Sequence, residues 1–338
     1  MKTNYLILPI LLLLASYFLL PTSTEAQLNF GSLNVGGSIS LPNELNVDII
    51  PNYPKPNSNV RVALTMYTEN LDNATIDWYV DGQKVLSGIG EKNYTVTTGK
   101  GGTETKVEIV ITLASGTQFS KSITLRPATV DLLWQSDSYV PPFYKGKALF
   151  PSQGNIIITA MPEFYSSGNK ISPANLNYSW TVNNKVLQSQ SGYGKQSVRV
   201  AGPALGTSIN AYVTVTHNAS GISGDQSLIV SPVEPNIVFY ENSPLYGIIY
   251  ERAVNRGLNM KSDEVNIIAS PYYMNMDDNI TYNWKMNARQ AEGVTGLSAT
   301  FRRPEGGPGS TVLSLSVQNL RKILQQGEAG FNINYGNE

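Results

Sequence analysis

The sequence predicts an all-β protein made of three tandem β-sandwich domains behind an N-terminal signal helix. One short phrase around a tryptophan recurs at 77–80 (DWYV), 179–182 (SWTV) and 283–286 (NWKM). The tryptophans are 102 and 104 residues apart, and a repeat of about 100 residues is one small domain. Tyr, Thr, Val, Gly and Asn are abundant and helix-period runs are missing, which favours strands joined by tight turns.

Each tryptophan lies at the centre of an alternating strand. The residues two before and two after it are apolar in all three copies, and the intervening residues are mostly polar. Because successive side chains of a strand point to opposite faces, the apolar set shares one face. We therefore expect Trp78, Trp180 and Trp284 to form the structural core of their domains. The dipeptides that follow are Asp81-Gly82 and Asn183-Asn184, which suit a tight hairpin, and Asn287-Ala288, which does not.

The repeat divides the chain into segments in order. Residues 1–26 are predicted to be a signal peptide and 27–44 a tether rich in Gly, Ser and Asn. Module 1 covers 45–127, module 2 covers 128–232 and module 3 covers 233–338. Arg126-Pro127 and Ser231-Pro232 mark the boundaries, because a proline after a final strand ends pairing and stiffens a short linker. We expect a semi-rigid rod of three modules.

The N-terminal segment has the layout of a secretory signal. Lys2 precedes an apolar run at 6–20, Pro21 breaks the helix, and Thr24-Glu25-Ala26 suits cleavage before Gln27. The alternative is an uncleaved anchor, but the run is shorter than the roughly 20 residues that span a bilayer. The expected location is therefore outside the cytoplasm: extracellular, cell surface or periplasmic. Membrane contact is expected only through an uncleaved signal segment.

Composition excludes several classes of partner. The formal net charge is −1 and 14% of residues are charged, so we expect no nucleic acid partner. The chain has no cysteine, hence no disulfide and no lipid-modified cysteine. An exported sandwich protein without cysteine favours a bacterial source.

Modules 2 and 3 share an extra segment that module 1 lacks. From the first strand to the tryptophan the copies measure 30 (Asp48 to Trp78), 49 (Asp131 to Trp180) and 48 residues (Asn236 to Trp284). The insertions, 138–155 and 243–262, are rich in aromatic residues and proline, and each has a cation followed by Ala. Their candidate junction or partner contacts are Tyr139, Phe143, Tyr144, Lys147, Tyr246, Tyr250 and Arg252.

Three interpretations of the insertions are open. Each insertion folds onto its own module or the one before it and closes a junction, or it contacts a ligand or partner, or it is an inert loop. Recurrence in two consecutive modules favours the junction. Exposed Tyr, Phe and Arg would instead be good binding anchors.

Two resemblances follow from these motifs. The Trp-x-Val-Asp/Asn phrase resembles the central strand of immunoglobulin-like and PKD-like domains, without the cysteine pair of the former or the Gly-Asp-Gly turn of the latter. The runs at 130–134, 141–148 and 191–195 (VDLLW, PPFYKGKA, SGYGK) resemble exported proteins of ultrasmall candidate-phyla-radiation (Patescibacteria-type) bacteria. The latter resemblance implies location and fold, and no activity.

We expect no enzyme and no cofactor. His217 is the only histidine and no Gly-x-Ser-x-Gly elbow, P-loop or zinc cluster accompanies it. Asp277, Asp278 and Asp72 are candidate calcium ligands near the tryptophan strands, although Asp and Asn also cap turns.

The sequence therefore favours a non-enzymatic exported cell-surface or envelope protein in adhesion, presentation or surface structure. A subunit of a pilus-type or other surface assembly and a carbohydrate-binding protein are the alternatives. The expected partners are other envelope or surface proteins, with polysaccharide as a further candidate.

Overall fold

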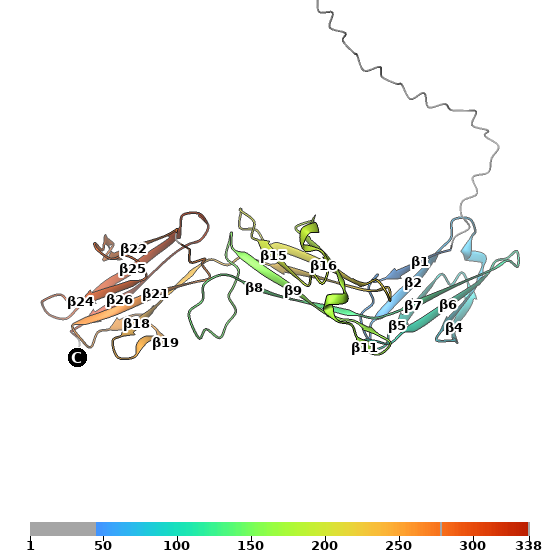
Figure 1. Ribbon diagram of the computed structural model, residues 1–338, viewed down its shortest axis with the longest axis horizontal. Coiled ribbons are helices and arrows are strands. Elements are labelled where there is room, and N and C mark those ends of the chain that lie inside the picture. Colours follow the sequence, from blue (N-terminus) through green and yellow to red (C-terminus); the bar gives the residue numbers. More distant parts are fainter. Residues whose placement is uncertain (1–44, 278, 337–338) are drawn as a thin grey trace, which may run out of the picture. The chain divides into compact units, whose positions relative to one another are not determined.

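The computed structural model describes residues 45–277 and 279–336, which are drawn in colour in Figure 1. The predicted signal peptide and tether lie outside the described residues. Within the described ranges the chain is all β apart from three short 3-10 turns, which confirms the predicted fold class of three tandem sandwiches. No helix in those ranges has the length and apolarity that crossing a bilayer requires.

Module 1 has seven strands in two sheets. They are β1 (Asn46–Ile50), β2 (Asn59–Thr65), β3 (Thr75–Val80), β4 (Gln83–Ile89), β5 (Asn93–Thr97), β6 (Thr105–Thr112) and β7 (Gln118–Leu125), with the turn η1 (Leu71–Asn73) before β3. The sheet orders are β1-β2-β5 and β4-β3-β6-β7, and every pairing is antiparallel. The fourth strand joins the tryptophan strand, so the order differs from constant-type immunoglobulin domains, where it joins the other sheet.

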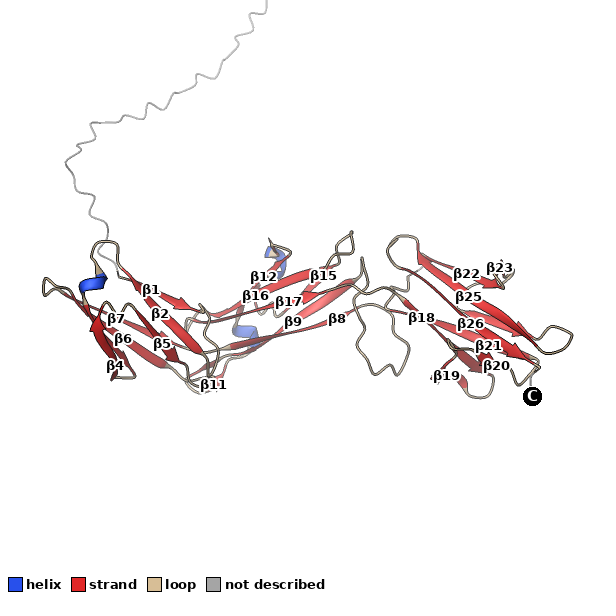
Figure 2. Ribbon diagram, turned by 180° about the vertical axis from the view of Figure 1, so that it is seen from behind, coloured by secondary structure: helices blue, strands red, loops and turns tan. Residues whose placement is uncertain are grey.

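Module 2 repeats this order with extra short elements. Its strands are β8 (Thr129–Ser136), β9 (Asn155–Glu163), β10 (Tyr165–Ser166), β11 (Asn169–Lys170), β12 (Asn177–Val182), β13 (Lys185–Val186), β14 (Gly192–Tyr193), β15 (Ser197–Ala201), β16 (Ile209–His217) and β17 (Ile222–Val230), with turns η2 (Pro173–Asn175) and η3 (Gln188–Gln190). The sheets are β15-β9-β8 and β13-β12-β16-β17, with β14 also on β12 (Figure 2).

Module 3 has larger sheets. Its strands are β18 (Asn236–Ser243), β19 (Gly247–Ala253), β20 (Leu258–Asn259), β21 (Glu264–Tyr272), β22 (Ile280–Met286), β23 (Arg289–Gln290), β24 (Ser298–Arg302), β25 (Gly309–Asn319) and β26 (Gln326–Tyr335). The sheets are β19-β18-β21-β24 and β20-β26-β25-β22-β23. The insertion supplies both added edges: β19 extends the first sheet, and β20 pairs in parallel with β26.

The three tryptophans occupy equivalent places in the cores. Trp78, Trp180 and Trp284 are fully buried, each at the centre of its own apolar cluster. Each indole N–H donates to a backbone oxygen in the bend before the next core strand: Glu91 at 2.8 Å, Lys195 at 2.8 Å and Gly296 at 2.9 Å. Tryptophan therefore fills the core and anchors this bend in the same way three times. The flanking apolar positions are less uniform: Met286, at the end of β22, is 46% exposed because the strand leaves the core there.

The hairpin after each tryptophan strand is also shared. Residue pairs Val80/Gln83, Val182/Lys185 and Met286/Arg289 close two-residue turns whose central residues all have positive φ, as type I′ turns require. The first turn residue accepts from the facing strand through its side chain, Asp81 from Lys106 N, Asn183 from Asn210 N and Asn287 from Val312 N. Asn287-Ala288 forms the same turn as the other two, although Ala288 stands at φ +65°.

We expect Ala288→Gly to stabilise module 3 by about 0.5–1 kcal/mol. A left-handed conformation costs an L-residue roughly 1–2 kcal/mol, and the extra chain entropy of glycine offsets roughly half of this gain. Urea unfolding measures the difference. Gly82→Ala is the matched control in module 1: a Cβ at Gly82 meets nothing within 4 Å, so only the backbone at φ +81° opposes it. Gly82→Ala should lower the unfolding free energy of module 1. If Ala288→Gly also lowered that of module 3, the positive φ of residue 288 would not be the source of strain.

Candidate functional site

The extra residues of modules 2 and 3 lie between their first and second strands. Only 51–58 separate β1 from β2, whereas 137–154 separate β8 from β9 and 244–263 separate β18 from β21. In module 3 the insertion folds onto its own module as β19 and β20. In module 2 its first part contacts module 3 and its end packs on module 2.

The module 2 insertion extends a strand ladder of module 3. Pairing between β18 and β21 ends at Asn236 and Tyr272. The next residues pair with the insertion: Tyr139 N donates to Met274 O at 2.8 Å, and Tyr273 N donates to Tyr139 O at 2.8 Å. The expectation that this insertion lies on its own module or the one before it is therefore only partly met: Phe150 at its end is buried in the module 2 core, but Tyr139 pairs with the module that follows.

Five tyrosines from both insertions and two strands then meet in what we term the tyrosine cluster: Tyr144, Tyr240, Tyr250, Tyr272 and Tyr273. Tyr144 lies edge-on to Tyr272 with 5.3 Å between ring centroids, and Tyr250 lies edge-on to Tyr240 at 5.2 Å. The hydroxyls pair at 2.7 Å, Tyr144 with Tyr273 and Tyr240 with Tyr272. Edge-to-face rings add roughly 0.5–1.5 kcal/mol per pair beyond area burial. Tyr144 is the one member from module 2, so its ring contacts with Tyr272 and Tyr273 and its hydroxyl contact join the two modules here.

Burial disfavours ionisation of three tyrosines of the cluster, Tyr250, Tyr272 and Tyr273. Burial, followed by the hydrogen bond with Tyr144, raises the pKa of Tyr273 to about 12. Burial and the Tyr240 hydroxyl raise the pKa of Tyr272 further, and burial raises that of Tyr250. A tyrosine hydroxyl can both donate and accept a hydrogen bond, so the two hydroxyl pairs fix how the rings lie.

A buried amide network lies beside the cluster. Gln325 is fully buried; its Oε1 accepts from Asn275 N at 2.8 Å, and its Nε2 donates to Ser152 O at 2.8 Å and Asn275 Oδ1 at 2.9 Å. Asn275 Nδ2 donates to Asp137 Oδ1 at 2.9 Å. Desolvation raises the pKa of Asp137, but hydrogen bonds from Asn155 and Asn275 outweigh it and hold the pKa below its usual value. Modules 2 and 3 are thus joined by polar groups that satisfy one another.

The remaining predicted residues of the module 2 insertion differ in role. Lys147 Nζ lies 3.4 Å from the ring centroid of Trp134 on β8, so the end of the insertion folds back onto module 2. Desolvation by burial lowers the pKa of Lys147. Phe143 is 94% exposed at φ +63°, in a turn closed by Tyr144 N donating to Pro141 O at 3.3 Å. The insertion is therefore anchored on both sides of an exposed phenylalanine.

The predicted residues of the module 3 insertion occupy three environments. Tyr250 belongs to the tyrosine cluster. Tyr246 is 79% exposed at the turn between β18 and β19. Arg252 Nη2 lies 3.2 Å from Glu241 Oε2 across the same hairpin.

The candidate calcium ligands are not brought together. Asp72 in module 1 pairs with Lys92 Nζ at 2.6 Å. Asp277 in module 3 accepts from Asn279 N at 3.0 Å and Asn319 Nδ2 at 3.1 Å, which is turn chemistry. Asp278 lies outside the described residues. In the part of the chain that the structure describes, no three His, Cys, Asp or Glu side chains form a group that could hold a metal.

The single histidine has a local role. His217 ends β16, and its Nδ1 lies 2.7 Å from Ser220 Oγ in the turn to β17. Its carbonyl oxygen accepts from the backbone N–H groups of Ser220 and Gly221 at 3.2 and 2.9 Å. These contacts fix the turn.

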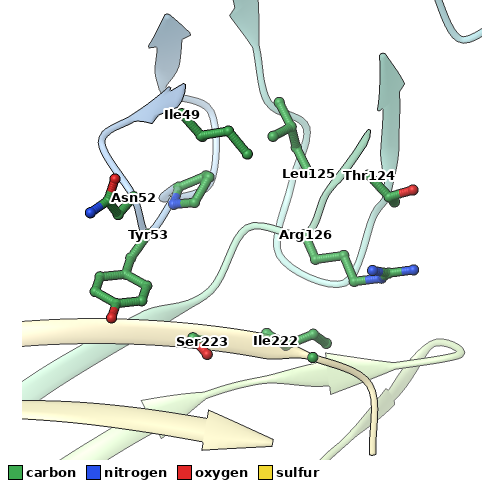
Figure 3. Close-up of a pocket in the computed structure, with 10 residues that line it drawn as sticks. Ile49, Asn52, Tyr53, Thr124, Leu125, Arg126, Ile222 and Ser223 are labelled. Atoms are coloured by element: carbon green, nitrogen blue, oxygen red, sulfur yellow. The ribbon is translucent and has the colours of Figure 1, made fainter. Parts of the chain in front are cut away.

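A hollow of about 260 Å³ lies near this turn, shown in Figure 3. It is lined by the β1–β2 loop, the end of β7 and the start of β17. Arg126 is its one charged lining residue and pairs with Glu104 at 2.8 Å. Figure 3 shows Arg126 and Tyr53 pointing apart, so the hollow brings no set of polar groups to one point.

Sequence reasoning missed the residues that complete the junction. Trp134 lies in an alternating strand, and this alternation indicates which face is buried but not that Lys147 contacts the ring. Asp137, Asn275 and Gln325 are single polar residues among many, and nothing local distinguishes them. Their roles come from partners far along the chain, since Gln325 and Ser152 are 173 residues apart.

The geometry defines a class, a tandem array of β-sandwich domains. No protein-family model matches the chain, and a search of curated proteins found no match. The central fibronectin-III array of RIM-binding protein is 12% identical and covers 89% of this chain and 100% of its own, with a TM-score of 0.32. The three N-terminal domains of the bacteriophage RB49 highly immunogenic outer capsid protein (Hoc) are 10% identical over 86% of this chain and 98% of theirs, with a TM-score of 0.26.

A shorter structure is also similar. The fibronectin(III)-like modules of Clostridium thermocellum CbhA are 12% identical and cover 56% of this chain and 94% of their own, with a TM-score of 0.28. Likeness at these scores assigns no function to this chain.

Proposed function

We propose that this chain is a non-enzymatic exported cell-surface or envelope protein whose semi-rigid array of immunoglobulin-like domains serves adhesion, presentation or surface structure. The observation that carries the proposal is the junction between modules 2 and 3. Strand pairing through Tyr139, the tyrosine cluster and the amide network around Gln325 hold two domains together without a long linker. A fixed pair of domains suits a protein that presents a surface.

The short connection supports the same proposal. β17 ends at Val230 and β18 begins at Asn236, and within the connection Val233 N donates to Phe150 O at 2.8 Å. Even this segment is tied to the module 2 insertion. Relative motion is the default between domains of one chain, and strand pairing, ring contacts and hydrogen bonds at this junction oppose bending.

Phe143 favours a second candidate, a subunit of a pilus-type or other surface assembly. A phenylalanine that is 94% exposed between two anchored segments loses little entropy on binding and offers a large apolar area. In that candidate the insertion would join modules 2 and 3 and dock a neighbouring envelope protein.

Surface labelling of intact source cells tests the proposal. A membrane-impermeant, amine-reactive biotin should label the chain before lysis while leaving a cytoplasmic marker unlabelled. N-terminal sequencing of the labelled protein should begin at Gln27. Labelling only after lysis, with the cytoplasmic marker labelled to the same degree, would exclude a surface role.

A further inference from the structure

A second feature of module 3 lies at its outer edge, in a cleft of about 490 Å³ that we term the module 3 cleft. It is bounded by the end of β18, by β19 and by the segment from β20 to the start of β21. Its volume is within the range of about 300–1,000 Å³ typical of small-molecule sites. The residues that line it include Glu241, Tyr246, Arg252, Leu258, Lys261 and Val265.

An irregular strand pairing creates the cleft. Tyr240 faces Ala253 and Asn242 faces Ile248, so the segment 249–252 stands opposite Glu241 alone. The surplus residues have no ladder partner of their own on β18, although the Tyr250 ring and the Arg252 guanidinium contact Tyr240 and Glu241. Bulges of this kind re-aim side chains at sheet edges and are frequent next to functional sites. Module 1 has no such segment, because a short loop joins β1 and β2.

The lining is apolar below and polar at the rim. Val254, Leu258 and Val265 form a floor with exposures of 2%, 8% and 8%. At the rim, Tyr246 presents an exposed ring, and Arg252 keeps most of its five donors beyond its one contact with Glu241.

We propose that the module 3 cleft binds a short stretch of an oligosaccharide. Sugar rings have apolar C–H faces and hydroxyl edges, and this lining offers both kinds of surface side by side. The Tyr246 ring stacks on a ring face, the floor takes apolar C–H groups, and Arg252, Glu241 and Lys261 hydrogen-bond the hydroxyls. An uncharged or a uronic-acid sugar would use the same contacts, the latter adding a carboxylate for Arg252 or Lys261.

This inference does not depend on the surface location or on the stiff junction. The cleft belongs to module 3 alone, so it binds sugar whether or not the protein is displayed on a cell. If no oligosaccharide bound, the proposed surface function would still stand. If surface labelling failed, the proposal of oligosaccharide binding in the cleft would still stand.

The test uses purified chain from residue 27 onward on a printed array of neutral, amino-sugar and uronic-acid oligosaccharides of four to six residues. Binding to at least one class is expected, and dissociation constants for that oligosaccharide follow by titration calorimetry. Tyr246→Ala and Arg252→Ala should each weaken binding at least tenfold, because each removes a main contact. Preference for neutral or uronic-acid members identifies the kind of sugar.

Tyr67→Ala is the matched control, since Tyr67 in module 1 is 77% exposed and lies far from the cleft in sequence. Its affinity should equal that of the unsubstituted chain. Circular dichroism confirms that every variant is folded. Absence of binding across the whole array, unchanged affinity in both cleft variants, or an equal loss in Tyr67→Ala would overturn the proposal.

Discussion

Replacing Trp180 with alanine is expected to cost module 2 about 4 kcal/mol of unfolding free energy and to loosen module 3 as well. Large-to-small changes of a fully buried aromatic residue cost roughly 3–5 kcal/mol, against a total of about 5–15 kcal/mol for a domain. The change also leaves the Lys195 carbonyl without the indole donor. Hydrogen exchange followed by mass spectrometry should show lost protection across 128–232 and at the junction residues of module 3.

Two variants separate core packing from coupling. Trp180→Phe keeps much of the ring and loses the indole N–H, so it should cost roughly 1–2 kcal/mol. Trp78→Ala should remove protection from module 1 and leave module 3 unchanged, because the junction contacts of module 3 are with module 2. If Trp180→Ala loses hydrogen-exchange protection only within 128–232, modules 2 and 3 are not coupled. If it lowers the unfolding free energy of module 2 by less than about 1 kcal/mol, Trp180 does not have the core role assigned to it.

The repeated tryptophan strands were predictable because their determinants are local. Alternation around Trp78, Trp180 and Trp284 sets the buried face, and the residues after each strand set the hairpin. Asn287-Ala288 shows the limit of local reasoning. The dipeptide is poor for a type I′ turn, yet Asn287 accepts from Val312 N and the facing strands hold Ala288 at positive φ. Tertiary pairing therefore overrides turn preference here.

The junction was only half predictable. The aromatic composition of the insertions pointed to Tyr139, Tyr144 and Tyr250, because large apolar rings are expected to pack against another surface. Which surface they cover depends on where β21 leaves unpaired backbone, and that is a property of the folded sheet. Gln325 gives no sequence signal, because its burial is produced by Ser152 and Asn275 closing over it. Hydrogen bonds between polar groups this far apart in the sequence depend on the folded structure and leave no local sequence pattern.

Gln325→Ala is therefore expected to separate modules 2 and 3. Removing the side chain leaves Asn275 N, Asn275 Oδ1 and Ser152 O without their Gln325 partner inside the junction. Each unsatisfied buried group costs roughly 1–3 kcal/mol, and the two Asn275 groups are the buried ones, so a loss of about 2–6 kcal/mol is expected. In differential scanning calorimetry, modules 2 and 3 should unfold as one transition in the unsubstituted chain and as two in the variant.

Spin labels give the structural side of the same prediction. The chain has no cysteine, so Lys185→Cys and Arg289→Cys, at equivalent hairpins of modules 2 and 3, give a clean label pair. The distance distribution should be narrow in the parent and broad after Gln325→Ala. Gln326→Ala is the matched control, because this neighbouring glutamine is exposed at the start of β26 and its removal should change neither measurement. A broad distance distribution in the parent would mean that the contacts at this junction do not hold the modules in one arrangement. A narrow distance distribution after Gln325→Ala would mean that the tyrosine cluster and the Tyr139 pairing hold the modules instead.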